Sequence, residues 1–370
     1  MSNLRIFNFK NHAEVELAFD AAVTCVVGNN GSGKTNVLDA IYYLAFSKSA
    51  FNPYDVQNIR HQQQAFFLRG RFTAGGKVKE VECALQAGGK KVLREDGLDY
   101  QRFSEHVGKY PVVLIAPQDI ELIWDGAELR RKFVDAMLSQ TNRTYLQHLI
   151  NYTHSLKQRN GLLRNFSESG RVDKDLLETY NTQLVQAGNY LHEQRAKFST
   201  EFEASVKAHY AYLADNPAED VGIRYRSDLT DKSFSDLLAG SLPRDIALQR
   251  TTTGIHRDDF LFQLNDFEIR RVGSQGQQKS LLVALKLSEF QILYNVLGVK
   301  PILLLDDIFD KLDDFRIQKL INLITAGTFG QLFITDARPE RTRQILHAAQ
   351  IKATVFHIEN GTFTQAWLRG

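Results

Sequence analysis

The sequence predicts an α/β fold in which both ends of the chain build one head and a helical segment is inserted between them. A glycine-rich loop at residues 28–35 lies between an apolar, strand-like run and a segment with apolar residues at helical spacing. A second apolar run, residues 302–305, ends in two consecutive aspartates far along the chain. Between them, apolar residues recur at helical spacing with no proline from 118 to 216. One compact core does not need so large a gap, so we expect the two ends to meet.

The composition is that of an ordinary soluble globular protein, with 370 residues, 43% hydrophobic, 24% charged and a formal net charge of +2. So small a net charge does not by itself indicate a nucleic-acid partner. Cys25 and Cys83 lie in strand-like runs and are expected to be buried free thiols, which suits a reducing cytoplasm. No apolar run is long enough to span a membrane, and the N-terminus lacks a signal-peptide core. We therefore expect a cytoplasmic protein without a membrane partner.

The N-terminal part contains strand-like runs at 4–9, 15–19 and 23–27, followed by the glycine-rich loop and its helix. Residues 66–100 alternate apolar and polar side chains between pairs of glycines, which predicts an antiparallel meander. Another buried strand is predicted at 111–116.

The glycine-rich loop, GNNGSGKT, has the context of a phosphate-binding loop. Its glycines allow a tight turn that brings backbone N–H groups close to phosphate, and the helix N-terminus adds partial positive charge. Lys34 can reach the β- and γ-phosphates of a nucleotide, and the Thr35 hydroxyl can ligate Mg²⁺. The alternative is a glycine-rich turn with a solvated lysine. The predicted binding residues of the loop are Gly28, Asn29, Asn30, Gly31, Ser32, Gly33, Lys34 and Thr35.

A helical insertion is predicted at residues 123–241, between head segments 1–122 and 242–370. Apolar residues recur in a near-heptad pattern around a break at 167–171, which predicts two long helices folded back on each other with a tip near Gly170. These helices either project as an arm or form an ordinary helical subdomain packed on the rest. In both cases the insertion is not a second catalytic domain.

The C-terminal part continues the alternation of strands and helices. The predicted elements are a strand at 221–225, a polar loop at 251–259, a hairpin at 260–270, a helix at 280–297, a strand at 301–305, helices at 315–326 and 339–349, a strand at 331–335 and a strand pair at 354–366.

Asp306 and Asp307 follow the buried strand at its carboxyl end, which is the edge where open α/β sheets bind ligands. In a P-loop enzyme an aspartate at this position holds the Mg²⁺ that Thr35 also contacts. Asp307 would then orient or deprotonate the attacking water. The alternative is a strand-end turn with two solvated aspartates.

The motif SQGQQ, residues 274–278, lies immediately before the helix predicted at 280–297. Serine caps backbone N–H groups at a helix N-terminus, glycine allows close approach, and the helix dipole attracts anions. Alone, the motif is equally typical of an ordinary capped helix. Between the phosphate-binding loop and the two aspartates, it points to a nucleotide site.

These motifs together resemble a known family. GNNGSGKT, SQGQQ and ILLLDD occur in this order around a helical insertion, as in ATP-binding-cassette heads of the SMC type. The closer resemblance is to the RecF family of bacterial recombination-repair proteins. It covers nearly the whole chain through LRIFNFKN (4–11), APQDIELI (116–123), TTGIHRDDF (252–260) and GSQGQQKSL (273–281).

The resemblance implies an ABC-type P-loop ATPase head, a mixed sheet with an antiparallel β-subdomain, and a coiled-coil-like helical lobe. The implied catalytic residues are Asp307 and Lys34, and the implied metal ligands are Thr35, Asp306 and Gln118. Ser274, Gly276 and Gln277 would form a signature motif that reads the γ-phosphate of ATP bound to a second subunit, and Gln118 would be the Q-loop residue. Residues 312–313 would lie beside the dimer seam.

The resemblance also implies a function. The protein would be an ATP-dependent switch that binds DNA without sequence preference at single-strand/double-strand junctions, as a homodimer with ATP and Mg²⁺. It would help to load RecA at gaps with RecO and RecR, in recombination, replication, repair and the SOS response to DNA damage. Slow ATP hydrolysis would release it from DNA.

Some residues depart from the pattern of such heads. Asp307 stands where most use a longer glutamate, which suggests slow hydrolysis, and Lys10 stands where an arginine is common. Thr335 and Asp336 stand where a switch histidine is usual. The segment 256–259 has two open interpretations, a hydrogen-bonded structural turn or a sensor of nucleotide and dimer.

Two other functions fit parts of the sequence. A transporter's cytoplasmic ATPase subunit shares the nucleotide motifs, but the long insertion speaks against it. A non-catalytic SMC-like DNA tether would need the arm but not hydrolysis. DNA contacts are weakly specified, because solvated charged faces are common. The candidates are Arg130, Arg131, Lys132, Lys157, Arg159 and Arg164 on the insertion and Arg69, Arg71, Lys77 and Lys79 on the meander.

Overall fold

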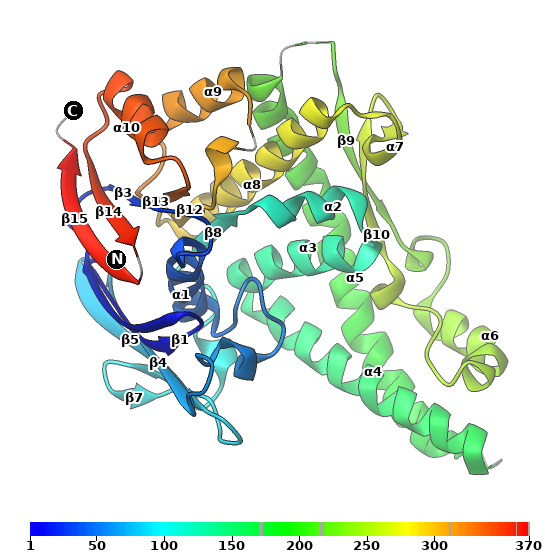
Figure 1. The fold of residues 1–370 in the computed structure, drawn as a ribbon. Coiled ribbons are helices and arrows are strands. Elements are labelled where there is room, and N and C mark those ends of the chain that lie inside the picture. Colours follow the sequence, from blue (N-terminus) through cyan, green and yellow to red (C-terminus); the bar gives the residue numbers. More distant parts are fainter. Residues whose placement is uncertain (170–172, 215, 217, 311, 360, 369–370) are drawn as a thin grey trace. The chain divides into compact units, whose positions relative to one another are not determined.

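The computed structural model describes residues 1–169, 173–214, 216, 218–310, 312–359 and 361–368 (Figure 1). The chain forms two compact units. The first contains both ends of the chain, Met1–Asp119 and Glu289–Gly370, and the second is Ile120–Ser288. Both ends of the chain thus lie in the same unit.

The first unit contains a six-stranded sheet in the order β15-β14-β3-β13-β12-β8, in which β15 alone is antiparallel to its neighbour. All five residues of β3 are buried, as expected of a strand covered on both faces. The strands are β3 (Val23–Val27), β8 (Val112–Ile115), β12 (Ile302–Leu305), β13 (Gln331–Asp336), β14 (Ala353–Glu359) and β15 (Thr362–Leu368).

A second sheet in the same unit is antiparallel, in the order β2-β1-β4-β5-β6-β7, and confirms the predicted meander. Helix α1 (Lys34–Phe46) contacts strands of both sheets, and one apolar core joins all three layers. The strands are β1 (Asn3–Phe9), β2 (His12–Ala18), β4 (Ala65–Ala74), β5 (Lys77–Gln86), β6 (Val92–Glu95) and β7 (Leu98–Asp99). Cys25 and Cys83 are buried free thiols, as predicted.

Short helices and two longer helices complete the first unit. They are the 3₁₀ helices η1 (Asp55–Asn58), η2 (Phe103–Glu105) and η6 (Ile308–Asp310), and the α-helices α9 (Asp314–Thr325) and α10 (Pro339–Ala348). The 3₁₀ helix η3 (Pro117–Ile120) lies at the boundary between the units.

The second unit combines helices with a small antiparallel sheet in the order β11-β10-β9. Its helices are α2 (Glu121–Trp124), α3 (Ala127–Thr141), α4 (Arg143–Ser169), α5 (Lys174–Leu213), α6 (Phe234–Ala247) and α7 (Ile269–Val272), with η4 (Asp228–Thr230), η5 (Ile255–Arg257) and most of α8 (Gln275–Leu297). Its strands are β9 (Val221–Arg226), β10 (Asp259–Leu264) and β11 (Phe267–Glu268).

The predicted pair of long helices is present as α4 and α5, which pack along each other. Helix α5 has 40 residues and is therefore about 60 Å long. Helix α6 packs against both, and near their far ends Leu163, Phe166 and Leu177 form an apolar cluster with Leu242 and Ile246. The predicted tip at Gly170 lies outside the described residues. The paired helices are thus part of a subdomain with its own packing, not a bare hairpin.

The second unit extends beyond the predicted insertion, 123–241, because the segment that follows packs with the helices. Strand β9 contacts α5, and β10 contacts α3 and α7. Helix α8, predicted at 280–297, begins at Gln275 instead. Among the described residues α8 alone is long and apolar enough to cross a membrane, but 67% of its most apolar window is buried, as in a core helix of a soluble protein.

Candidate nucleotide-binding site

The glycine-rich loop connects β3 to α1, as predicted, and two of its glycines are required by close neighbours. A Cβ on Gly28 would lie 2.4 Å from the carbonyl oxygen of Ile358. Gly33 has φ 107°, and its Cβ would lie 2.6 Å from the Asn11 side chain. The turn between β1 and β2 thus supports the loop from one side, and His12 Nε2 lies 3.0 Å from the Gly33 carbonyl oxygen.

Lys34 lies at the start of α1 and folds back over the loop. Its ammonium donates to the carbonyl oxygens of Gly28 and Asn29, at 2.9 and 3.1 Å, and the residue is only 4% exposed. The Ser32 hydroxyl is buried and has no hydrogen-bond partner among the described residues. Asn29, Asn30 and Gly31 are exposed. A buried cation and an unsatisfied hydroxyl at the same loop fit an anionic ligand such as a phosphate.

Thr35 and Asp306 come together from opposite ends of the chain. The Thr35 hydroxyl donates to the Asp306 carboxylate, with oxygens 2.9 and 3.1 Å apart. Burial raises the pKa of Asp306, while hydrogen bonds from Thr335 and Thr35 oppose this shift. Mg²⁺ commonly takes one or two protein oxygens and completes its shell with phosphate and water. A hydroxyl facing a carboxylate therefore fits a Mg²⁺ site.

Thr335, at the end of β13, organises both aspartates. Its hydroxyl donates to Asp306 Oδ1 at 2.6 Å and accepts the backbone N–H of Asp307 at 3.0 Å. Asp307 has φ 44°, a left-handed conformation that is uncommon for aspartate. The adjoining Asp336 holds the start of α10, accepting from the N–H of Arg338, the residue before the helix, and from the Thr342 hydroxyl. These contacts assign roles to two residues whose place in the site the sequence left open.

Gln118, the predicted Q-loop residue, lies in η3 and is exposed. Among the described residues it makes no hydrogen bond to Thr35 or Asp306. Its neighbour Asp119 accepts the Ala116 N–H at 2.7 Å, and the negative charge of Asp119 also raises the pKa of Asp306. The structure thus brings the charge of Asp119, which the sequence did not single out, close to the Asp306 carboxylate.

Lys10, noted for replacing an arginine, forms an ion pair with Asp39 at 2.6 Å. Asp39 is fully buried and also accepts hydrogen bonds from the Ser49 hydroxyl and the Ala50 N–H. The Lys10 ammonium also lies 5.0 Å from the centre of the Phe51 ring. In this structure Lys10 is therefore a structural residue of the β1–β2 turn.

The predicted signature motif lies in the second unit and begins α8. The Ser274 hydroxyl accepts the Gln277 N–H at 3.3 Å, and Gln277 Oε1 accepts the Ser274 N–H at 2.7 Å. This reciprocal pair is a capping box. It explains why α8 starts at Gln275, five residues before the helix that the apolar pattern predicts. Ser274 is exposed, and Gly276 and Gln277 are half-buried.

The loop at 251–259 is tied to the helices of its unit by buried ion pairs. Asp258 pairs with Arg195 of α5 at 3.0 Å, and Asp259 pairs with Arg130 of α3 at 2.8 Å. His256 contacts the Tyr152 hydroxyl through Nδ1 at 2.8 Å, and burial lowers the pKa of His256 to about 4. These contacts favour the structural interpretation of segment 256–259.

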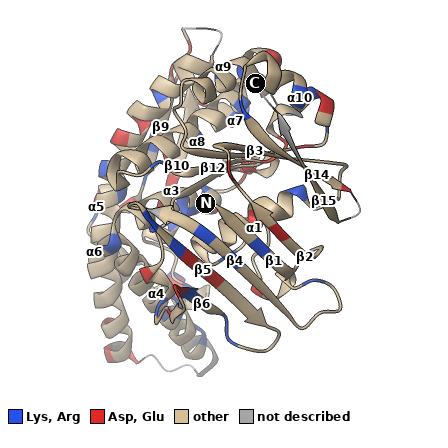
Figure 2. Ribbon diagram, turned by 90° about the vertical axis from the view of Figure 1, so that its left-hand side faces the viewer, with Lys and Arg blue, Asp and Glu red and all other residues tan. Residues whose placement is uncertain are grey.

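Two of the candidate DNA contacts are wrong, because Arg130 and Arg159 are buried and ion-paired. Arg159 and its partner Asp245 have fully buried side chains. On the meander, basic and acidic segments are interleaved over β4 and β5 (Figure 2). Three of the four meander candidates are ion-paired: Arg69 with Glu82, Arg71 with Glu80 and Lys79 with Asp96.

The remaining candidates have different surroundings. Lys132 pairs with Glu128, whereas Arg131 donates to the backbone carbonyl of Asp258. Lys157, Arg164 and Lys77 are exposed. A basic side chain that is already ion-paired with a carboxylate attracts phosphate only weakly. Lys157, Arg164 and Lys77 are therefore better candidates for DNA contacts than the ion-paired residues.

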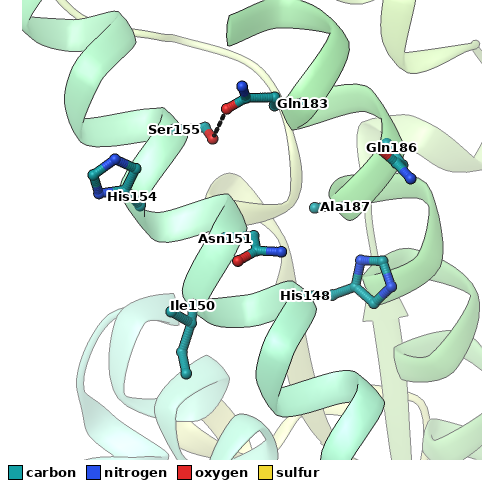
Figure 3. A pocket seen from close by; sticks show the side chains of 8 residues that line it. All are labelled: His148, Ile150, Asn151, His154, Ser155, Gln183, Gln186 and Ala187. Atoms are coloured by element: carbon teal, nitrogen blue, oxygen red, sulfur yellow. Dashed lines mark hydrogen bonds between the residues drawn. The ribbon is translucent and has the colours of Figure 1, made fainter. Parts of the chain in front are cut away.

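A cavity of about 340 Å³ lies between α4 and α5 (Figure 3). None of the residues that line it belongs to the nucleotide-binding motifs. Ser155 donates to Gln183 at 2.8 Å across its wall, and His148 stacks on Tyr190. The lining residues are His148, Ile150, Asn151, His154, Ser155, Gln183, Gln186 and Ala187. These polar contacts interrupt the apolar seam of the two helices.

The chain is similar to known proteins over almost its full length. The family model described as the RecF/RecN/SMC N terminal domain matches residues 1–363. The DNA replication and repair protein RecF of Flavobacterium johnsoniae is 44% identical over 358 residues, covering 97% of this chain and 99% of that protein.

Solved structures show the same similarity. A structure of the recombination mediator protein RecF-ATP in the RecFOR pathway has a TM-score of 0.89 at 29% identity, over 99% of this chain and 97% of that one. The Smc head domain with an extended coiled coil from Pyrococcus furiosus has a TM-score of 0.56 at 15% identity, over 100% and 96% of the two chains. The latter similarity concerns the fold alone.

Proposed function

This chain belongs to the RecF family of DNA replication and repair proteins, and on that basis we propose that it is an ATP-dependent DNA-binding switch of recombinational repair. Its fold is that of an ABC-type ATPase head with an inserted helical lobe. Family membership speaks against a transporter subunit. We also place the protein in the bacterial cytoplasm, where its DNA is.

The observation that carries the nucleotide role is the pairing of Thr35 with Asp306, which joins the phosphate-binding loop to the acidic strand end. Bound Mg²⁺ would neutralise charge on the β- and γ-phosphate oxygens. Lys34 would leave the loop carbonyls to bind the same phosphates. Asp307 would orient the attacking water and accept its proton, and the short side chain would keep this step slow.

The exposed Ser274 of the signature motif supports a dimer that closes around ATP. Ser274, Gly276 and Gln277 would bind the γ-phosphate held by the loop of a second copy of this chain. The solved relative is described as part of the RecFOR pathway. We extend this to RecO, RecR and RecA as partners, with sequence-independent binding at DNA junctions.

Lys34→Met tests this function, because methionine keeps the packing volume of the side chain but removes its charge. The variant should lose ATP binding, and with it ATP-dependent retention on junction DNA. ATP affinity is measured by fluorescence of a labelled nucleotide, and retention by filter binding. Lys90→Met, which changes an exposed lysine of the same unit, is the control.

Near wild-type ATP affinity in Lys34→Met would refute the assignment of the loop. If wild-type protein binds ATP and DNA but shows no turnover, the SMC-like tether would replace the switch as the better model.

A further inference from the structure

We propose that Glu219 is a positioning residue of the signature motif, which sets the orientation of the Gln277 amide and thereby the geometry of Ser274. This inference rests on the proposed function, since it assumes that these residues meet ATP bound to a second copy of the chain.

The Gln277 side chain is held at both ends of its amide. Its Oε1 accepts the Ser274 backbone N–H at 2.7 Å, and its Nε2 donates to Glu219 Oε1 at 2.9 Å. Half a turn of the amide would place its oxygen against the carboxylate and its NH₂ group against the Ser274 N–H. Both contacts would then be repulsive, because a carboxylate only accepts hydrogen bonds and a backbone N–H only donates them. Glu219 therefore selects the one orientation that closes the capping box.

Glu219 is itself fixed by a helix of the insertion. The buried Tyr210 hydroxyl, on α5, donates to Glu219 Oε2 at 2.5 Å. The carboxylate thus lies between a buried residue of α5 and the first turn of α8, and its two oxygens have different partners. Because each carboxylate oxygen has its own partner, the Glu219 side chain is held in one orientation.

The closed capping box determines what Ser274 can offer a ligand. Its hydroxyl oxygen accepts the Gln277 N–H at 3.3 Å, which leaves the hydroxyl proton available for donation to another group. Ser274 is exposed, so this proton can be donated to an incoming phosphate oxygen. Without Glu219 the Gln277 amide can rotate, the capping box loses the hydrogen bond from the Ser274 N–H, and the Ser274 backbone that carries the hydroxyl is held less firmly.

Glu219→Ala should weaken ATP-dependent dimerisation about fivefold, the effect of one capping interaction. The ATP affinity of the monomer should not change, because the phosphate-binding loop belongs to the first unit. Glu219→Gln keeps an acceptor for Gln277 and should recover most of the affinity. Asp220→Asn is the matched control, since this neighbouring carboxylate pairs with Lys207. Sedimentation with saturating ATP measures the dimerisation constant.

A double-mutant comparison separates positioning from general damage. If Glu219 acts through Gln277, then Glu219→Ala combined with Gln277→Ala should dimerise no more weakly than Gln277→Ala alone. Additive losses, an equal loss in Asp220→Asn, or wild-type dimerisation of Glu219→Ala would each overturn the positioning role. Ser274→Arg separates the failure of the positioning role from the failure of the proposed function. If this variant dimerised normally with ATP, the proposed function itself would be wrong.

Discussion

The hydroxyl of Thr335 places two consecutive aspartates in different surroundings. It holds the Asp306 carboxylate by a 2.6 Å hydrogen bond and fixes the Asp307 backbone through its N–H. The pairing of parallel strands explains the contact. Leu305 of β12 lies opposite Ile334 of β13, so the residues that follow them, Asp306 and Thr335, are neighbours. In the proposed mechanism the two carboxylates therefore have different roles, Asp306 as metal ligand and Asp307 as base.

Asp307→Asn should bind ATP normally but hydrolyse it at least about 100-fold more slowly, because an amide cannot accept the proton of the attacking water. The ATP-bound dimer should consequently live longer than that of the wild type. Phosphate release measures turnover, and size-exclusion chromatography with ATP measures the lifetime of the dimer.

Asp314→Asn is the control for this variant, because Asp314 is an exposed carboxylate in the first turn of α9. Turnover should stay at the wild-type level there. Unchanged turnover in Asp307→Asn would mean that another group is the base.

At the scale of elements, the loop 251–259 depends on a histidine that is neutral in the folded protein. Burial lowers the pKa of His256 to about 4, below the 6.5 of an unperturbed histidine. The unfolded chain then binds a proton that the folded chain excludes. His256 therefore costs no stability above about pH 6.5, and the protein loses stability as the pH falls from there toward 4.

His256→Gln removes this titration while keeping a side chain that can hydrogen-bond. Between about pH 6 and 4.5, the unfolding free energy of the wild type should fall more steeply than that of the variant, by up to about 1.4 kcal/mol per pH unit. Urea titrations at several pH values measure the two slopes. His209→Gln is a comparison at a less buried histidine.

If the unfolding free energy of His256→Gln fell with pH as steeply as that of the wild type, His256 would not be responsible for the loss of stability in acid. A smaller difference in slope at His209 than at His256 is expected.

Local patterns were sufficient to predict most elements, whereas long-range pairing was not visible in them. The glycine loop, the meander and the paired helices follow from spacing within short windows. Arg130 and Arg159 resemble exposed helix cations in sequence, but their partners Asp259 and Asp245 lie far along the chain. The C-terminal limit of the insertion, predicted at residue 241, differs from the end of the second unit at Ser288 for the same reason, because β9 contacts α5 and β10 contacts α3.

In the site, too, residues in local motifs could be predicted from the sequence, whereas residues that act through tertiary contacts could not. Lys34, Thr35 and Asp306 were predicted because their spacing within motifs is distinctive, and the structure brings Thr35 and Asp306 into contact. Asp119 and Glu219 carry no such local signal. Their roles depend on tertiary neighbours, namely the buried Asp306 carboxylate and the Gln277 amide.

At the scale of the whole molecule, the ATPase motifs are divided between the two units. The first contains Lys34, Asp306 and Asp307, and the second contains Ser274 and Gln277. In the proposed dimer, each site takes its loop from one copy and its signature motif from the other, repeated by two-fold symmetry. Ser274→Arg should therefore bind ATP as a monomer but fail to dimerise, because the larger cationic side chain disrupts the capping box.

Mixing two inactive variants tests this composite arrangement directly. Lys34→Met cannot bind ATP and Ser274→Arg cannot complete a partner's site, so each should lack turnover alone. A mixed dimer has one site with both defects and one with neither. Because neither variant forms an ATP-bound dimer with itself, the dimers that form in ATP are mixed, and each has one intact site of two. ATPase activity should therefore reappear on mixing, to at most about half of the wild-type level, if one closed site suffices to hold the dimer. Loss of ATP binding by monomeric Ser274→Arg would instead place Ser274 in the site of its own chain, and the composite model would fail.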